Sequence, residues 1–327
     1  HRDLHLSIRR QRQMCIRDRI NQDIGLKIRG GSTRRYEKKS LTVYARSEYG
    51  DGTMDYNFFP ELPYTSYDRL TLSNSGWDFR HTKFRDAMAH SLCKSLNVES
   101  EAYQPTISFV NGEYFGILNI RERYDNNYFQ RVYNTNSVDL LENSADIKEG
   151  DEVHYTAMTN YLESNSMASE SNYDYIKTQL DPESFSDFFI ANIFFQNADF
   201  PNNNVQYWRN RTSSYEPNAA YGLDGRWRWL LHDMDASFSF GTNDFNGNSL
   251  AIATSINTTD VNPDWSTLIL RKLLENDSFK IDFINRFADL MNTSFLSSRI
   301  ISKIDELKNV IAPEMPEEIS RWSVPEN

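Results

Sequence analysis

Apolar and polar residues alternate over much of the first third of the chain, which predicts strands with one buried and one exposed face. Strands are expected in five runs, at residues 24–29, 38–46, 70–72, 104–110 and 113–121. Asn111-Gly112 separates the last two runs, and this dipeptide is the preferred centre of a two-residue hairpin turn. Residues 82–96 instead repeat apolar positions every three or four residues, so we expect one helix beside an antiparallel sheet.

Helical spacing dominates the rest of the chain. Helices are expected at residues 126–133, 153–164, 185–197, 268–274, 277–292 and 296–311. The third of these starts from Asp181-Pro182, an N-cap aspartate followed by proline at the first helical position. Two strands, at 205–209 and 226–232, interrupt the helices. Three segments have the polar composition of connecting loops: 134–152, 164–172 and 242–264.

This pattern predicts an α+β fold with a sheet-rich part at residues 20–123 and a mainly helical part at 124–327. Residues 1–19 differ from both, because they hold six arginines, two aspartates and no periodicity. They resemble translated sequencing-adapter sequence, so we exclude them from reasoning about the fold. The chain begins without methionine and without a recognisable secretory signal, and we expect a fragment whose true N-terminus is missing.

The composition narrows the classes of partner. Apolar residues make up 39% of the 327, enough for a sizeable core. The net charge of −11, with no long basic tract in the body of the chain, argues against nucleic acid as the main partner. No run of about 18 apolar residues is present, so no membrane-spanning helix is expected. Cys15 and Cys93 are too few for a disulfide scaffold or a cysteine-based zinc site.

Acidic and amide side chains gather in two loops of the second part. Asp199 and Asn204 follow a buried helix, and Asp233 and Asp235 follow the last strand. Such residues often mark turns, because they bond to their own backbone and tolerate left-handed conformations. The alternative is the order used in phosphoryl transfer, where an Asp positions the acceptor hydroxyl and an Asn and a later Asp hold Mg²⁺. Three carboxylates that converge without a countercharge would repel one another, so the cluster makes best sense around a cation.

Residues of the first part are candidates for binding a nucleotide. Lys38 and Lys39 are adjacent on a strand, so only one of them can face a cleft, and we predict that Lys39 does so and holds phosphates. Gly30-Gly31 either brings backbone N–H groups near a phosphate or forms a plain hairpin turn.

Three acidic residues have two interpretations each. Glu122 and Asp125 lie where the sheet passes into the helical part, and they are expected either to bind ribose or to cap the next helix. Asp86 either pairs with the strand lysine, as an acidic residue does in kinases, or forms a solvated charge pair.

The chain resembles the CotH kinase family, an atypical branch of the protein-kinase-like fold. The resemblance covers nearly all of residues 20–327. It is carried by Lys38-Lys39-Ser40, by Asn111 to Gly116 continuing to Glu122-Arg123, by Asn197-Ala-Asp199 with Asn204, by Trp229 to Phe238, and by Ile319 to Trp322. His232 stands where the family usually has an aromatic residue.

The resemblance implies a two-lobed protein-kinase-like fold with an antiparallel sheet in the N-lobe and a mainly helical C-lobe. It also implies transfer of the γ-phosphoryl group of ATP to Ser or Thr of a protein, with Mg²⁺ or Mn²⁺. Asp199 would be the catalytic residue, Asn204, Asp233 and Asp235 would bind metal, and Lys39 and Glu122 would contact the nucleotide. A secreted or cell-surface bacterial protein is expected on the same basis.

Two other functions remain possible from the sequence alone. The same fold could serve as a pseudokinase or surface binding module, with the polar cluster used for structure or recognition. A metal-dependent hydrolase or carbohydrate-active domain is the third possibility, since the chain has several carboxylates and many aromatic residues. Stabilisation by ATP and Mg²⁺ distinguishes the first from an active kinase, because a ligand that binds the native state raises its melting temperature.

Overall fold

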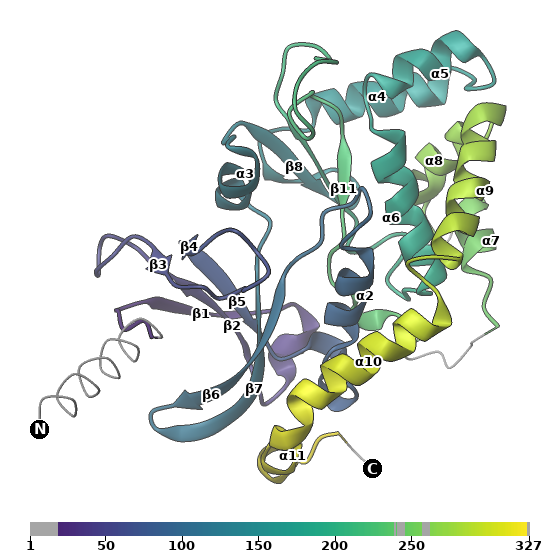
Figure 1. Cartoon of the computed structure of the whole chain (residues 1–327). Helices are drawn as coiled ribbons and strands as arrows, with labels where there is room; N and C mark the ends of the chain where they lie inside the picture. The colour runs from purple at the N-terminus through teal and green to yellow at the C-terminus, as the bar shows by residue number, and fades with distance from the viewer. Residues whose placement is uncertain (1–18, 239, 241–245, 257–261, 326–327) are drawn as a thin grey trace, which may run out of the picture.

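The computed structural model describes residues 19–238, 240, 246–256 and 262–325. The predicted adapter-like segment therefore lies, apart from its last residue, outside the described residues. The fold is α+β, as the sequence predicts, with antiparallel sheets and with helices α4 to α9 (residues 153–291) gathered on one side of them (Figure 1). None of the helices within the described residues is long and apolar enough to cross a membrane.

A five-stranded antiparallel sheet occupies the first part of the chain, in the order β1-β2-β5-β7-β6. Its strands are β1 (Gly25–Arg29), β2 (Ser40–Tyr44), β5 (Arg69–Ser73), β6 (Tyr103–Val110) and β7 (Glu113–Arg121). Asn111 and Gly112 have φ angles of 52° and 81°, the left-handed pair that this hairpin turn requires. Helix α2 (Arg85–Cys93) and the short pair β3 (Met54–Asp55) and β4 (Ser66–Tyr67) complete this part.

A second sheet, in the order β11-β10-β8-β9, lies in the later part of the chain. Its strands are β8 (Val138–Glu142), β9 (Asp146–Glu149), β10 (Gln206–Asn210) and β11 (Arg228–Leu230). The prediction that residues 134–152 form only a loop is therefore wrong. Val138 to Leu141 is a fully buried run whose partner, β10, is more than 60 residues away, so it lacks the alternation by which a half-buried strand is recognised.

The helices of the later part agree with the predicted positions to within a few residues and add three short ones. They are α3 (Asn126–Tyr133), α4 (Val153–Ser164), α5 (Glu170–Lys177), α6 (Pro182–Phe194), α7 (Ser249–Thr254), α8 (Asp264–Leu273), α9 (Asp277–Met291), α10 (Ser297–Ile311) and α11 (Met315–Trp322). The end of the predicted loop 164–172 and part of the loop 242–264 are thus helical. The aspartate of Asp181-Pro182 caps α6 as predicted, accepting bonds from the N–H groups of Glu183 and Ser184.

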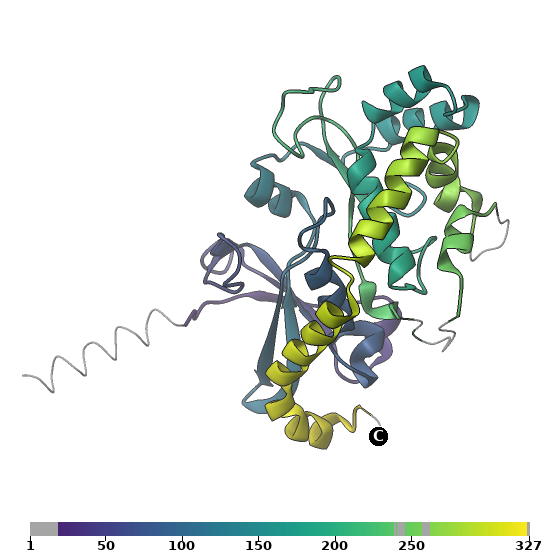
Figure 2. The same ribbon diagram turned by 45° about the vertical axis from the view of Figure 1, so that its right-hand side comes forward.

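The main core surrounds α6, whose apolar residues face inward on nearly every side. Phe189 contacts both Phe185 and Phe188, and Phe185 also packs against the tryptophan of β11, Trp229. Helix α10 crosses from this core to α2, and α11 ends beside β7, so the C-terminal segment returns to the first sheet (Figures 1 and 2). A rigid, buried α6 gives the loop that follows it a fixed starting point.

Candidate active site

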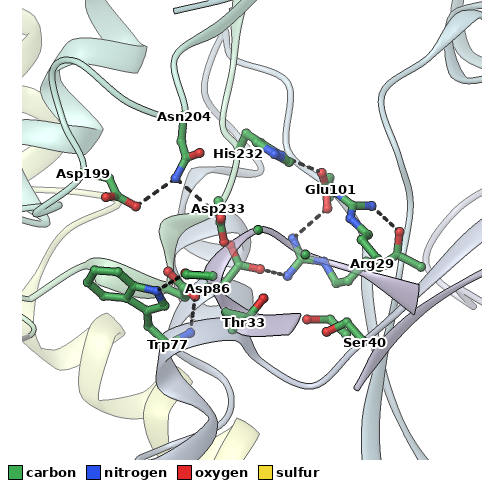
Figure 3. A pocket seen from close by; sticks show the side chains of 18 of the residues that line it. Arg29, Thr33, Ser40, Trp77, Asp86, Glu101, Asp199, Asn204, His232 and Asp233 are labelled. Carbon is green, nitrogen blue, oxygen red and sulfur yellow. Dashed lines mark hydrogen bonds and ion pairs between the residues drawn. The ribbon is translucent and has the colours of Figure 1, made fainter. Parts of the chain in front are cut away.

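A cavity of about 350 Å³ lies where the turn after β1 faces the loops that follow α6 and β11 (Figure 3). Its walls are mainly polar and come from segments that are distant in sequence, between Arg29 and Asp235. Four of the six residues predicted from the sequence line this cavity: Asp199, Asn204, Asp233 and Asp235. Lys39 and Glu122 do not belong to its wall.

The loop that carries Asp199 is fixed to the segment after β11 by its backbone. Asn197 follows α6 and donates its side-chain amide to Asn192 Oδ1 at 3.0 Å, and its Oδ1 accepts the Asp199 N–H at 3.2 Å. The Ala198 N–H donates to the carbonyl of Ala236 at 3.0 Å. These bonds explain why two loops that are over 30 residues apart meet at one wall of the cavity.

Asn204 joins the two acidic loops. Its Nδ2 donates to Asp199 Oδ2 at 2.8 Å and lies 3.5 Å from Asp233 Oδ2 (Figure 3). Asn204 has a φ of 58°, a left-handed conformation that asparagine tolerates better than most residues. Partial burial raises the pKa of Asp199, although its bonds with Asn203 and Asn204 oppose that shift.

Asp233 and Asp235 flank the start of a 3₁₀ turn, η3 (Met234–Ala236). The Asp233 side chain is exposed to the cavity, whereas Asp235 is buried and accepts the Trp77 N–H at 2.6 Å. Burial and the neighbouring Asp233 raise the pKa of Asp235 to about 9, and the limited access of bulk water inside the cavity raises the pKa of Asp233 as well. Two ionised carboxylates this close together repel each other, and a bound cation would relieve that repulsion.

Asp86, at the start of α2, also lines the cavity and forms an ion pair with Arg121 of β7. It accepts the Met234 N–H at 2.8 Å, so it holds η3 as well. Burial alone would raise the pKa of Asp86, but Arg121 and His90 hold it well below its usual value. Asp86 is therefore neither the partner of a strand lysine nor a solvated charge, since its partner is a buried arginine.

Glu101 connects this pair to His232. Its carboxylate lies 3.3 Å from Arg121 Nη2 and 3.4 Å from His232 Nδ1 (Figure 3). Burial would lower the pKa of His232, but the contact with Glu101 raises it overall. His232 fills a place in the wall beside Asp233 and is oriented by this carboxylate.

The structure places Lys39 away from the cavity. Its Nζ donates to the carbonyl oxygens of Arg34 and Tyr36, at 2.8 and 2.6 Å. Both lysines lie just before β2, outside the strand, and the one that points inward is Lys38, which is fully buried against Glu318 at 2.5 Å. Neither lysine lines the cavity, so this geometry does not support phosphate binding by Lys39.

Glu122 is a structural residue in this fold. It is 3% exposed, and its carboxylate pairs with Arg131 of α3 at 2.7 Å and accepts the Ala102 N–H at 3.2 Å. Asp125, the other residue considered for ribose, caps α3 by accepting the N–H groups of Asn127 and Tyr128. The helix-capping interpretation therefore describes Asp125, and Glu122 ties the end of the first sheet to the same helix.

Removal of this buried carboxylate is expected to destabilise the fold. Glu122→Ala leaves Arg131 buried without its partner, which should lower the free energy of unfolding by about 3–5 kcal/mol. Urea unfolding measures the change, and Glu113→Ala, at an exposed position on β7, is the matched control. If Glu122→Ala keeps its stability and loses affinity for ATP, Glu122 contacts the nucleotide and its structural role is wrong.

Several wall residues were not predicted from the sequence, chiefly Arg29, Glu101 and Trp77. Arg29 is the last residue of β1, and its Nη1 donates to Thr71 Oγ1 of β5. Its place at the end of a strand, directly before Gly30-Gly31, is the feature that could have identified it. Glu101 lies in an irregular segment and Trp77 in a short 3₁₀ turn, and no local pattern marks either residue.

The donor set of this wall suits a hard divalent cation. The groups around Asp233 include the carboxylates of Asp199 and Asp235 and the side-chain amide of Asn204, and carboxylate and amide oxygens are ligands that Mg²⁺ and Mn²⁺ prefer. Rotating the Asn204 amide by half a turn brings its oxygen toward Asp199 and Asp233. Within the described ranges no three His, Cys, Asp or Glu side chains stand in a metal-holding geometry.

A sequence model of the family described as CotH kinase protein matches residues 26–327. The match includes both sheets, all the described helices and every residue of the cavity wall. A search of curated proteins gave no match.

Proposed function

The chain belongs to the CotH kinase family, and from that premise we propose that it transfers the γ-phosphoryl group of ATP to a Ser or Thr hydroxyl of a protein acceptor. The observation that carries the proposal is the position of Asn204 between Asp199 and Asp233, two carboxylates on separate loops that share one cavity. This is the constellation of acceptor-orienting and metal-binding groups that phosphoryl transfer uses.

Each carboxylate has a distinct part in this proposal. Asp199, half-buried and with a raised pKa, accepts the proton of the acceptor hydroxyl and orients its oxygen. Asp233 and Asn204, with Asp235 behind them, would hold Mg²⁺ or Mn²⁺. The bound ion would neutralise the charge that develops on the phosphate oxygens.

Arg29 and the turn after it support the phosphates. The Arg29 guanidinium is anchored to Thr71 through one nitrogen, and its other donors face the cavity wall that it shares with Gly30 (Figure 3). Gly30 has a φ of +110°, and a Cβ there would lie 2.3 Å from Thr33 Oγ1. Only glycine fits this turn, which brings backbone close to the cavity. We therefore assign to Arg29 the phosphate-binding role that the sequence suggested for Lys39.

A second cavity of about 480 Å³ continues from the first and shares Arg29, Asn204 and Asp233 with it. Tyr44 and residues 123–125 line its far end, where the first sheet passes into α3. We assign this end to the base and ribose, so that the triphosphate runs from residues 123–125 toward Asp233. A nucleotide then spans both cavities with its γ-phosphate beside Asp199.

The test is incubation with labelled ATP and either Mg²⁺ or Mn²⁺, with a Ser/Thr-rich protein present and absent. Metal-dependent labelling of protein Ser or Thr supports the proposal. The rival function, a pseudokinase, predicts that ATP and metal raise the melting temperature without any labelling. No stabilisation and no labelling would contradict both. Secretion or attachment to the cell surface is proposed from the family alone.

Stabilisation by metal is expected to increase with pH. In the folded protein the pKa of Asp235 is raised to about 9, whereas in the unfolded chain it lies near 3.8. The folded state therefore binds the extra proton, and this contribution to stability is lost as pH rises through the folded pKa. Because metal binds the ionised carboxylate, the gain in melting temperature on adding Mg²⁺ should be larger at about pH 8.5 than at about pH 6.5. Asp235→Asn should flatten this dependence, and an equal gain at both pH values in the unaltered protein would contradict it.

A further inference from the structure

A buried carboxylate on α11 lies against the first sheet and is not part of the cavity wall. Glu318 is 0% exposed, and its Oε1 lies 2.5 Å from Lys38 Nζ and 3.2 Å from Lys83 Nζ. Its Oε2 accepts the Ile117 N–H of β7 at 2.8 Å. Both lysines are also buried, so one carboxylate is the shared ion-pair partner of two lysine side chains that have little contact with water.

Strand β7 leaves space for this carboxylate. Gly116 has a φ of +99°, and a Cβ there would lie 2.1 Å from Glu318 Oε2. Beside it, Trp322 of α11 donates its indole N–H to the Phe115 carbonyl at 2.9 Å and packs edge-on against the Phe115 ring. The end of α11 is therefore seated in a specific site, and it is not a loosely attached terminus.

Lys83 connects Glu318 to the candidate metal site. Its Nζ donates to the Phe79 carbonyl at 2.7 Å, at the end of the 3₁₀ turn η2 (Gly76–Arg80). Near the start of the same turn, the Trp77 N–H donates to Asp235 Oδ2 at 2.6 Å. The ammonium group thus fixes one end of a short turn whose other end holds a proposed metal-binding carboxylate.

Lys38 reaches the same turn by a second route. Its carbonyl accepts the Asn74 side-chain amide at 2.6 Å, and Asn74 Oδ1 accepts the Gly76 N–H at 3.0 Å. Gly76 has a φ of +58°, and a Cβ there would lie 1.9 Å from Asp235 Oδ2. Both ends of η2 are therefore tied to lysines that Glu318 holds, and the turn has no room to shift toward Asp235.

We propose that Glu318 is a positioning residue for the metal site: through Lys38 and Lys83 it fixes η2, and η2 fixes Asp235. The inference rests on the proposed function, because it assigns Asp235 to a bound divalent ion. It goes further in making the last helix part of the catalytic unit. A chain that ends before α11 would keep both carboxylate loops and lose the group that aligns one of them.

The test compares Glu318→Gln with the unaltered protein by the dissociation constant for Mn²⁺ in the presence of ATP, measured by electron paramagnetic resonance. Loss of an outer-shell partner typically weakens metal binding by about 10- to 100-fold, and we expect at least about tenfold here. Glu317→Gln, an exposed position on the same helix, should leave the constant unchanged. Glu318→Asp keeps the charge and should recover part of the affinity.

Two further variants separate positioning from general loss of stability. Glu122→Ala removes a buried carboxylate of another ion pair, so it should lower the melting temperature and leave Mn²⁺ affinity unchanged. If Glu318→Gln does not fold, the double variant Lys38→Met with Glu318→Gln replaces it. The double variant leaves only Lys83 buried without the carboxylate, and its Mn²⁺ dissociation constant is measured in the same way. Folded Glu318→Gln with wild-type Mn²⁺ affinity overturns this inference alone. An unaltered protein that neither binds Mn²⁺ nor labels an acceptor overturns the proposed function, and the inference with it.

Discussion

Asp233→Asn is expected to abolish phosphoryl transfer and to remove the stabilisation that ATP and metal together give the folded protein. Asparagine is the informative replacement because Asp233 has a φ of 53°, and asparagine tolerates this left-handed conformation. The change therefore removes the charge and keeps the backbone. Loss of one preorganised charged group costs at least about 10²-fold in turnover, and loss of the ion that it holds costs more.

The measurement is labelled phosphate transferred per enzyme, with thermal unfolding in the presence and absence of Mn²⁺ and ATP. Asp277→Asn, on the exposed surface of α9, is the matched control and should change neither quantity. Without ligands, Asp233→Asn should melt at or above the temperature of the unaltered protein, because it removes one of two opposed acid groups. Wild-type transfer by this variant would show that Asp233 does not hold the metal.

The parts of the fold that were predictable are those specified by neighbouring residues. Asn111-Gly112 determines its hairpin through turn chemistry, and Asp181-Pro182 determines the start of α6 through capping. Asp199 and Asn204 could be paired from the sequence for a similar reason, since Asn204 follows Asp199 by only five positions in one loop. The prediction that this loop also meets Asp233 came only from the order of the motifs along the chain. In the structure, the backbone hydrogen bond between Ala198 and Ala236 holds the two loops together.

The errors come from positions that distant contacts determine. Alternation showed that one of Lys38 and Lys39 faces inward, but the choice depended on Glu318, which lies 280 residues later. From the neighbouring residues alone, an ammonium group that pairs with a buried carboxylate on α11 cannot be distinguished from one that faces a nucleotide, and the structure places both lysines just before β2. Distant contacts also hid β8, which pairs with the far-off β10 as well as with the adjacent β9, and Arg29, whose orientation depends on Thr71.

The cationic side of the site also differs from the pattern of ordinary kinases, in which a strand lysine pairs with a glutamate on the adjacent helix. Here an arginine on β7, Arg121, pairs with Asp86 on α2. The inward-facing lysine, Lys38, pairs with Glu318 of α11 instead. The geometry links α2 to the metal side directly, because Asp86 also holds the Met234 N–H. Movement of α2 would therefore displace Asp233 and Asp235 together.

Asp199→Asn is expected to lose phosphoryl transfer, as Asp233→Asn does, but to keep the stabilisation by ATP and metal. The proposed metal-binding groups remain, so ATP and Mn²⁺ should still raise the melting temperature, while kcat falls by about 10²- to 10⁴-fold, the usual loss for a general base. The Asn204 amide loses a charged acceptor at 2.8 Å and keeps a neutral one, so the loop should stay in place. A change in kcat with little change in the KM for ATP would locate the effect at the acceptor hydroxyl.

The pH profile supplies the decisive measurement for that role. Partial burial raises the pKa of Asp199, so the acidic limb of kcat in the unaltered protein should lie above the range of an ordinary aspartate. The residual activity of Asp199→Asn should lack this limb, because the group that titrates is gone. Asn203→Ala, beside it on the same wall, removes a hydrogen bond that lowers the pKa of Asp199 and should shift the limb further upward. A limb that persists unchanged in Asp199→Asn would assign the titration, and with it the proton transfer, to another residue.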